Sequence, residues 1–453
     1  MLTPVGPAPA STSARRRWAV LAVVLFASIL DLLDSTITNI AAPAIAADLN
    51  GGQALIQWLG AAYALAMGVL LVVGGRLGDK YGRRRLFLVG ITGFTLASIA
   101  CGLAFDPASI VAFRLLQGAF GALLIPQGFG ILGAVFPRDQ LGTAFSVFAP
   151  ALGLSAIGGP VLAGFLIDAD LLGLGWRAMF LINIALGGLA IACAVRLLPP
   201  DPGDRAVTVD APGSALLAVT MLTLLYGLID GTSHGWSLPP VVCLGAGLVS
   251  FALFCRRQRT APQPLIKPSL LTNRGFTSGL ILGLAFNAAI AGLLLVLSLH
   301  LQNDLGRTPS GASLGLAPVA AGIVVASIAT HRSIARLGRR LILIGLLLTL
   351  TGVLTLLTGI ALILPVFVIG LGLGTCFGTV YQITLGDVDP AESGSASGSL
   401  SATQQLANSI GAAALTTVYF HAGPTVSLGV VAALLLSCCL LVRLLPRHAQ
   451  PRH

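Results

Sequence analysis

The strongest constraint on this chain is a succession of apolar runs, each long enough to cross a lipid bilayer as a helix. A bilayer core is crossed by about 20 helical residues. Short polar breaks separate runs of roughly this length along the whole sequence, at residues 18–42, 54–75, 85–104, 108–134, 142–167, 178–198, 213–231, 239–255, 276–302, 311–332, 340–361, 363–385, 394–421 and 425–445. The pattern predicts an all-α polytopic membrane protein with fourteen transmembrane helices.

The composition indicates that lipid, rather than water, surrounds most of the surface. Of the 453 residues, 56% are hydrophobic and only 9% are charged, whereas a soluble globular chain is about 25% charged. The net charge of +10 comes from short basic clusters between the apolar runs. No basic soluble domain is left to carry a nucleic-acid footprint, so we expect no nucleic-acid partner. The seven cysteines form no Cys-x-x-Cys pair, and we interpret them as small apolar residues rather than metal ligands.

The distribution of basic residues predicts the orientation. With the N-terminus placed in the cytoplasm, 23 of the 26 lysines and arginines fall in cytoplasmic segments. Only Arg177 and Arg307 fall outside, and Arg114 lies within a span. This bias predicts an even number of spans with both termini cytoplasmic. Arginine exceeds lysine by 24 to 2, which is typical of a GC-rich bacterial genome, so we expect the protein in the bacterial inner membrane.

The start of the chain has a second interpretation. The cluster Arg15 to Arg17, the apolar stretch behind it and the sequence APAIAA together resemble a secretory signal. Cleavage there would remove the two aspartates of the first run, and many apolar runs would still follow. We therefore interpret this stretch as the first span.

A faint internal repeat predicts the domain organisation. RLGDKYGRRRLFLVG (76–90) resembles RSIARLGRRLILIG (332–345), although a Gly-Arg-Arg loop would also serve topology alone. Two related halves around a midplane site are how many secondary transporters are built. We expect two six-helix bundles and two inserted helices: a tail 1–14, a bundle 15–198, inserted helices 199–257, a linker 258–275, a bundle 276–446 and a tail 447–453.

The sequence excludes ATP hydrolysis by this chain as the energy source. A phosphate-binding loop ends in Gly-Lys-Ser/Thr, but Lys80 is followed by Tyr81 and Lys267 by Pro268. An ion gradient remains, and one charge moved through 100 mV is worth about 2.3 kcal/mol. Collecting that energy requires a group within the membrane that can change its charge. We therefore expect proton coupling and no cofactor.

Two aspartates in the first span are the best candidates for that group. Asp31 and Asp34 share one helical face with Thr38. A charged aspartate at mid-membrane costs roughly 2.5–3.5 kcal/mol, so the face should look into the bundle or a watery cavity. The plainer alternative is that one of them hydrogen-bonds across helices or reaches the interface.

Arg114 is the one basic residue that lies within a span and away from its ends. We expect it to pair with an aspartate of the first span, to polarise a cavity water, or to extend to the outer surface. Gln117 follows it by three residues and adds a second polar group to the same face.

Four motifs in order resemble those of the fourteen-helix drug:proton antiporters of the major facilitator superfamily. They are LLDSTITNIAAP (32–43), GGRLGDKYGRRRLF (74–87), RLLQGAFGA (114–122) and GGPVLAG (158–164). The resemblance implies that Asp34 stands at the signature position and that the arginine of RLLQGAFGA takes part in proton coupling. Asp31 is an addition to the family pattern, and the spans after residue 276 contain no acid, which argues against cationic substrates.

The resemblance also implies a conformational gate. Asp79 and Arg83 have the i, i+4 spacing of an ion pair at a cytoplasmic hinge, and glycines with a proline would let the fifth helix bend and slide. The alternative is that the loop only fixes topology. The gate residues are Gly75, Asp79, Gly82, Arg83, Gly159, Pro160 and Gly164.

The sequence thus predicts a monomeric, proton-coupled antiporter that exports small, mostly hydrophobic molecules of the drug or antibiotic type by alternating access. Asp34, together with Asp31, would carry the proton while Arg114 tunes it. Polar or aromatic residues within spans are the expected cargo-binding groups: Trp58, Tyr63, Gln117, Asn183, Asn287, Tyr381 and Gln382.

Two alternatives remain open. One is a proton symporter that imports a small solute. The other is a membrane-embedded enzyme that uses Asp31-Leu-Leu-Asp34 as a metal-binding Asp-x-x-Asp. The enzyme is disfavoured because a second acid cluster is missing and a hard metal wants about six oxygen ligands.

Overall fold

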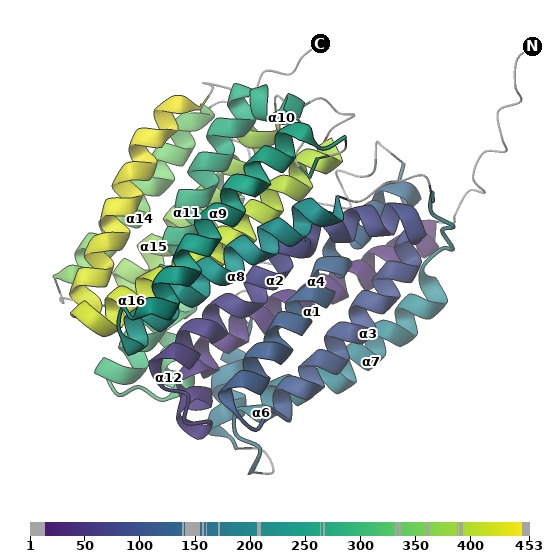
Figure 1. Cartoon of the computed structure of the whole chain (residues 1–453). Coiled ribbons are helices and arrows are strands. Elements are labelled where there is room, and N and C mark those ends of the chain that lie inside the picture. The colour runs from purple at the N-terminus through teal and green to yellow at the C-terminus, as the bar shows by residue number, and fades with distance from the viewer. Residues whose placement is uncertain are drawn as a thin grey trace, which may run out of the picture.

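The computed structural model describes residues 14–137, 140, 155, 158–159, 161–170, 173–205, 210–262, 264–265, 268–330, 333, 337–358, 362–386, 388 and 393–445. Within these residues the fold is all-helical (Figure 1). Twelve of the described helices are long and apolar enough to cross a membrane.

The first half of the chain forms a compact group of helices. They are α1 (Ala14–Asp48), α2 (Gly52–Tyr81), α3 (Arg83–Gly102), α4 (Pro107–Val135), α6 (Arg177–Leu181) and α7 (Asn183–Leu197). Helix α4 packs against both α2 and α3, while α1 contacts α2, α4 and α7. Of the expected span 142–167, only residues 161–167 form a described continuous helical stretch.

Local sequence explains where α4 begins. The Asp106 carboxylate accepts a hydrogen bond from the Ser109 backbone N–H at 2.6 Å, and the Ser109 side chain bonds back to the Asp106 backbone. This capping box is followed by Pro107 at the first helical position. The backbone hydrogen bond from Ser109 holds the pKa of the Asp106 carboxyl below its usual value.

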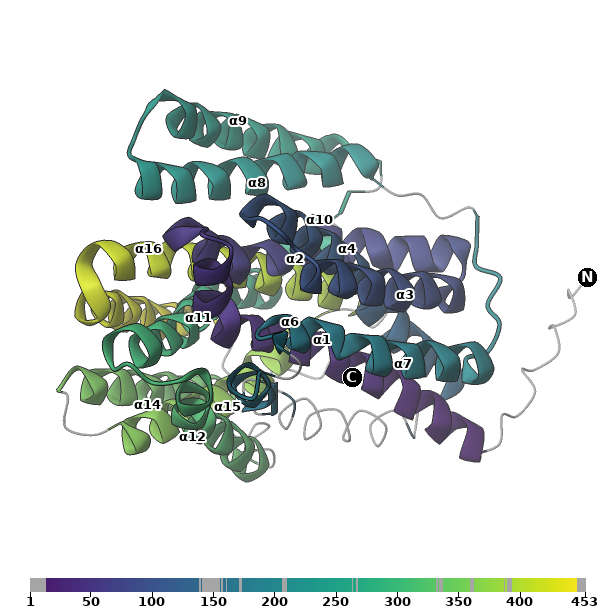
Figure 2. The same ribbon diagram turned by 90° about the horizontal axis from the view of Figure 1, so that it is seen from below.

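The two inserted helices form a hairpin of α8 (Ala211–His234) and α9 (Leu238–Thr260) along one side of the molecule (Figure 2). Leu225 and Ile229 of α8 are buried in a cluster with residues of α2 and α16. At the other end, Arg257 pairs with Asp210 at 3.0 Å. The outer surface of α9 is largely apolar, as expected for contact with lipid.

The second half contains α10 (Pro268–Thr272), α11 (Arg274–Leu299) with a π-helical extension η2 (His300–Asp304), α12 (Pro309–Thr330), α14 (Arg339–Leu357), α15 (Ile363–Gly386), α16 (Ser393–Leu441) and the short η5 (Val442–Leu444). Helix α16 runs through both of the last two predicted spans. It is interrupted at Gly423, which has a non-helical backbone with φ +82° and precedes Pro424. This interruption and the incompletely described fifth span account for the difference between twelve candidate helices and fourteen predicted spans.

The two copies of the repeat share a backbone feature. Gly82 precedes α3 with φ +94°, and Gly338 precedes α14 with φ +50°. Each glycine is followed by an arginine that donates to a backbone carbonyl of a neighbouring element. Arg83 reaches Gly130 O at 2.9 Å and Arg339 reaches Leu445 O at 3.1 Å. The similarity therefore extends from sequence to local geometry.

Candidate transport site

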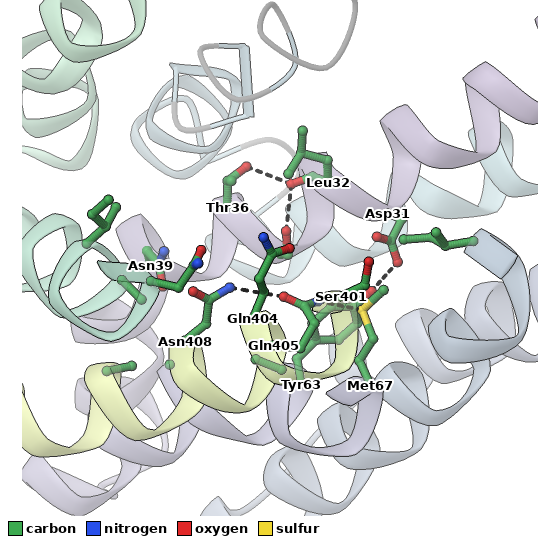
Figure 3. Close-up of a pocket in the computed structure, with 18 of the residues that line it drawn as sticks. Asp31, Leu32, Thr36, Asn39, Tyr63, Met67, Ser401, Gln404, Gln405 and Asn408 are labelled. Carbon is green, nitrogen blue, oxygen red and sulfur yellow. Dashed lines mark hydrogen bonds between the residues drawn. The ribbon is translucent and has the colours of Figure 1, made fainter. Parts of the chain in front are cut away.

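A cavity of about 430 Å³ lies between α1, α2 and α4 on one side and α11, α15 and α16 on the other (Figure 3). Its size falls within the range of small-molecule sites. Apolar side chains make up much of the wall. The polar lining residues are Ser28, Asp31, Ser35, Thr36, Asn39, Tyr63, Arg114, Asn287, Ser401, Gln404, Gln405 and Asn408.

Asp31 borders this cavity although it is only 6% exposed. The Tyr63 hydroxyl of α2 donates a hydrogen bond to Asp31 Oδ1. Gly121 of α4 faces this pair, and a Cβ added there would come within 2.7 Å of the Tyr63 hydroxyl oxygen and 3.0 Å of the Asp31 carboxylate. A residue without a side chain is therefore needed opposite the pair.

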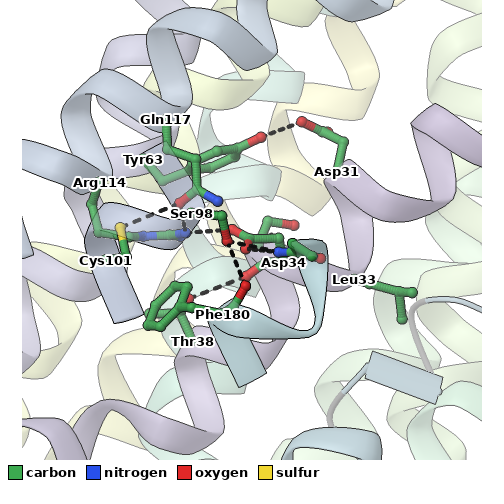
Figure 4. A network of polar contacts seen from close by, with 12 residues as sticks. Asp31, Leu33, Asp34, Thr38, Tyr63, Ser98, Cys101, Arg114, Gln117 and Phe180 are labelled. Atoms are coloured by element: carbon green, nitrogen blue, oxygen red, sulfur yellow. Dashed lines mark hydrogen bonds and ion pairs between the residues drawn. The ribbon is translucent and has the colours of Figure 1, made fainter. Parts of the chain in front are cut away.

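Asp34 lies one turn further along α1 and does not line the cavity. It is 2% exposed, and its Oδ2 lies 2.5 Å from Nη1 of Arg114, which is 1% exposed (Figure 4). The Asn183 side chain of α7 donates to the other oxygen, Oδ1, at 3.0 Å. Both carboxylate oxygens are thus engaged, and α1, α4 and α7 meet at one buried ion pair.

Arg114 connects the two aspartates. The same Nη1 donates to Gln117 Oε1 at 2.7 Å, and the guanidinium carbon lies 4.6 Å from the centre of the Tyr63 ring, within the range of a cation–π interaction. Buried Arg114 Nε hydrogen-bonds none of the residues that the structure describes. Tyr63 therefore contacts Asp31 through its hydroxyl and Arg114 through its ring.

The remaining cargo-binding candidates fall into three groups. Tyr63 and Asn287 line the cavity, and Gln117 and Asn183 lie behind it in the Arg114 and Asp34 network. Trp58 packs instead with the cluster that seats α8 on α2 and α16. Tyr381 is 39% exposed and does not line the cavity. Gln382 lies in α15, but its side chain is outside the described part of the structure.

Sequence reasoning missed one wall of the cavity. Gln404, Gln405 and Asn408 of α16 all line it, with Ser401 one turn earlier. The available signal was the stretch SATQQLANS inside an apolar run, which places three carboxamides within five residues.

The loop between α2 and α3 contains the expected ion pair. Arg83 Nη2 lies 2.9 Å from Asp79 Oδ1, and both side chains are partly exposed. The segment after α7 packs against this loop: Asp201 Oδ2 accepts from the Arg83 backbone N–H at 3.0 Å. A Cβ added at Gly82 would collide with the Asp201 carbonyl oxygen.

The other gate glycines differ in their packing. A Cβ at Gly75 would lie 3.6 Å from Pro126, an ordinary contact. A Cβ at Gly159 would collide with the Thr36 hydroxyl, and one at Gly164 would approach the Ser310 backbone at 2.6 Å. Pro160 lies outside the described residues. Gly159 and Gly164 therefore allow close approach to α1 and α12, respectively.

Polar contacts tie the two halves together at the end predicted to face outward, here called the outer end. Ser298 and Gln302 donate to the carbonyl oxygens of Asn39 and Ile40, each at 3.1 Å. The Ser310 backbone N–H donates to Asp168 at 3.1 Å. A smaller cavity of about 110 Å³ between α1, α11 and α12 shares Thr36, Asn39 and Leu294 with the main cavity.

A bundle of apolar helices around a central cavity, with a buried ion pair beside it, is the arrangement typical of a secondary transporter. The chain matches the Major Facilitator Superfamily over residues 24–412 and belongs to it. The match covers the helices that form the cavity.

Relatives and solved structures agree with this family. The chain is 43% identical to the "Probable actinorhodin transporter" of Streptomyces coelicolor, covering 92% of this chain and 75% of that protein. It is 34% identical to the "Puromycin resistance protein pur8" of Streptomyces alboniger, covering 89% and 82%. Its fold resembles the peptide transporter POT bound to sulfate (TM-score 0.69, 16% identity, 94% of this chain and 93% of that chain). It also resembles the xylose transporter XylE from E. coli (TM-score 0.66, 14% identity, 94% and 97%).

Proposed function

We propose that this protein is a proton-coupled antiporter that exports small, mostly hydrophobic molecules of the antibiotic type by alternating access. The observation that carries the proposal is the buried Asp34–Arg114 pair directly behind the cavity. Relatives named for antibiotic export and resistance support the direction of transport.

The arrangement corresponds to a state ready to receive cargo from the cytoplasm. The hydrogen bonds from Ser298 and Gln302 of the second half to α1 lie at the outer end. Asp34 is in contact with Arg114 in this state. Cargo would enter the cavity in this state and leave after the halves have rocked to open the outer end.

Proton binding to Asp34 would then reset the transporter. Removing one partner of a buried ion pair costs about 3–5 kcal/mol. One proton crossing 100 mV supplies about 2.3 kcal/mol, and a gradient of one pH unit adds about 1.4 kcal/mol. The gradient is therefore of the right magnitude to separate Asp34 from Arg114 once per cycle.

Asp31 would transmit the presence of bound cargo to the Asp34–Arg114 ion pair. It borders the cavity and accepts from Tyr63, whose ring lies against Arg114. Cargo that displaces the Tyr63 hydroxyl would move the ring and weaken its contact with the guanidinium. Both aspartates then take part, with Asp34 as the proton carrier and Asp31 as the coupling group.

The gate and the bundles would provide the movement. Residues 15–198 and 276–446 would act as two six-helix bundles, with the hairpin in 199–257 inserted between them. The Asp79–Arg83 pair would hold the cytoplasmic end in one state, while Gly159, Pro160 and Gly164 let the fifth helix slide. The protein would work as a monomer in the bacterial inner membrane, with both termini cytoplasmic.

No catalytic or cofactor chemistry is needed for this cycle. The carboxylates of the Asp-x-x-Asp stretch are engaged by Tyr63, Arg114 and Asn183 rather than directed at a common point. The described residues contain no group of three or more His, Cys, Asp or Glu side chains arranged to hold a metal.

The test is proton-driven uptake of an antibiotic into everted membrane vesicles. Asp34→Asn should abolish uptake at unchanged protein level, whereas Asp106→Asn, which keeps a helix cap at a partly exposed site outside the cavity, should not. Uptake by the Asp34→Asn protein equal to wild type would refute the assignment. An importing symporter would instead accumulate the compound in right-side-out vesicles under an inward proton gradient.

A further inference from the structure

Five carboxamide side chains converge on the main cavity from three helices. Asn39 comes from α1, Asn287 from α11, and Gln404, Gln405 and Asn408 from α16. Figure 3 shows the α16 residues projecting from one wall towards α1 and α2. Carboxamides in a membrane span often hydrogen-bond to neighbouring helices. The hydrogen bonds that they already make decide how much capacity is left to bind cargo.

These groups retain much unused hydrogen-bonding capacity. Asn408 donates to Gln405 Oε1 at 3.0 Å, Gln405 donates to the Met67 sulfur at 2.8 Å, and Asn287 donates to its own helix at Gly283 O at 2.8 Å. The Gln404 side chain hydrogen-bonds none of the residues that the structure describes. Each carboxamide offers two donors and an acceptor oxygen, so both donors and acceptors remain directed at the cavity.

The two charged residues that line the cavity, Asp31 and Arg114, have opposite signs. Arg114 is paired with Asp34, and Asp31 accepts from Tyr63. The Tyr63 hydroxyl is neutral, and the Arg114 guanidinium lies against the ring of the same side chain. A lipophilic cation bound beside Asp31 would therefore also meet a positive charge. The Tyr63 ring is the aromatic face beside Asp31, and the Arg114 guanidinium lies 4.6 Å from its centre. The site is therefore poorly suited to a positive charge.

Resting on the proposed function, we infer that the exported cargo is an uncharged molecule with a compact apolar skeleton and several hydroxyl and carbonyl groups. Gln404, Gln405 and Asn408 select it by hydrogen bonds. Apolar residues such as Leu59, Ile125 and Ile290 line the same cavity and would contact the skeleton. Sites built to hydrogen-bond a substrate strongly reject analogues that lack the bonding group.

The first experiment compares three compounds on one scaffold: a trihydroxyanthraquinone, its fully O-methylated ether, and a derivative bearing a quaternary ammonium. Uptake into everted vesicles is measured under the same proton gradient. The hydroxylated compound should have the lowest KM. One ordinary hydrogen bond corresponds to about a 2- to 13-fold change in affinity. The KM of the methyl ether should therefore be at least about twofold higher than that of the hydroxylated compound.

The second experiment changes the protein. Gln404→Leu and Asn408→Leu should each raise the KM for the hydroxylated compound about 2- to 13-fold and leave the KM for the methyl ether within twofold. Gln53→Leu, an exposed glutamine at the start of α2, is the matched control and should change neither value. Binding of the hydroxylated compound to purified protein, followed by its absorbance, reports affinity independently of transport.

The outcomes separate this inference from the proposed function. Preferred export of the quaternary ammonium compound, or an equal effect of the leucine variants on all three compounds, would overturn the inference while leaving proton-driven export intact. Selective binding of the hydroxylated compound without proton-driven uptake would overturn the proposed function and uphold the inference.

Discussion

Asp31 and Asp34 lie one turn apart on α1, yet their carboxylates have different surroundings. Asp31 borders the cavity and accepts from Tyr63, whereas Asp34 is enclosed by Arg114 and Asn183. The Tyr63 ring and the Arg114 guanidinium lie between them. Two acids that are neighbours in sequence are therefore connected through α2 and α4 rather than by a shared site, and their substitution should have different consequences.

Loss of Arg114 should destabilise the protein through the charge it leaves behind. Arg114→Leu leaves ionised Asp34 buried with Asn183 as its remaining described side-chain partner, and the expected loss in unfolding free energy is about 3–5 kcal/mol. The double variant Arg114→Leu/Asp34→Leu should recover most of it, because the carboxylate that lost its partner is also removed. Unfolding of the purified protein in detergent measures both values.

The ion pair of the α2–α3 loop is the matched control for that experiment. Arg83 and Asp79 are 35% and 46% exposed in their side chains, so solvent screens their interaction and Asp79→Asn should cost about 0–1 kcal/mol. Equal costs at the two pairs would show that the Asp34–Arg114 pair is hydrated in the working protein.

The two contacts of Tyr63 can be separated by substitution. Tyr63→Phe removes the hydrogen bond to Asp31 and keeps the ring over Arg114, with an expected cost of about 1–3 kcal/mol for leaving a buried acceptor unsatisfied. Tyr63→Leu also removes the cation–π contact and should cost about 0.5–2 kcal/mol more. Detergent unfolding gives the stabilities, and vesicle uptake shows which contact transport requires.

The comparison of Phe and Leu also tests the coupling role of the ring. If the ring transmits the presence of cargo to Arg114, Tyr63→Phe should retain more proton-driven uptake than Tyr63→Leu. Identical uptake by the two variants would argue against transmission through the ring.

Gly82 and Gly188 should respond to alanine with opposite signs. Gly82 has φ +94°, and an added Cβ would meet the Asp201 carbonyl, so Gly82→Ala should destabilise by about 1–3 kcal/mol. Gly188 lies within α7 with nothing near its Cβ position, and Gly188→Ala should stabilise by roughly 0.5–1 kcal/mol. Thermal unfolding of both variants tests the sign.

The sequence predicts site residues best where their chemistry differs most from the apolar residues around them. Asp31, Asp34 and Arg114 stand out because charges within apolar runs are rare and expensive, and all three are buried together. Carboxamides are cheaper to bury, so Gln404, Gln405 and Asn408 gave a weaker signal. Trp58 and Tyr381 were expected in the cavity, but their direction depends on how each helix is rotated. Helices that are apolar all round do not reveal that rotation.

The outer closure should depend on Gln302 and Ser298. Their side chains donate hydrogen bonds to backbone carbonyl oxygens of α1 near its outer end. Replacing both residues removes these two hydrogen bonds between α1 and α11. In a background without the seven natural cysteines, a cysteine at position 36 reports access, because Thr36 lines both cavities. The combined change Gln302→Leu/Ser298→Ala should increase its labelling by a membrane-impermeant thiol reagent applied from outside, and Gln53→Leu should not. Labelling that stays at the wild-type rate would show that other contacts close the outer end.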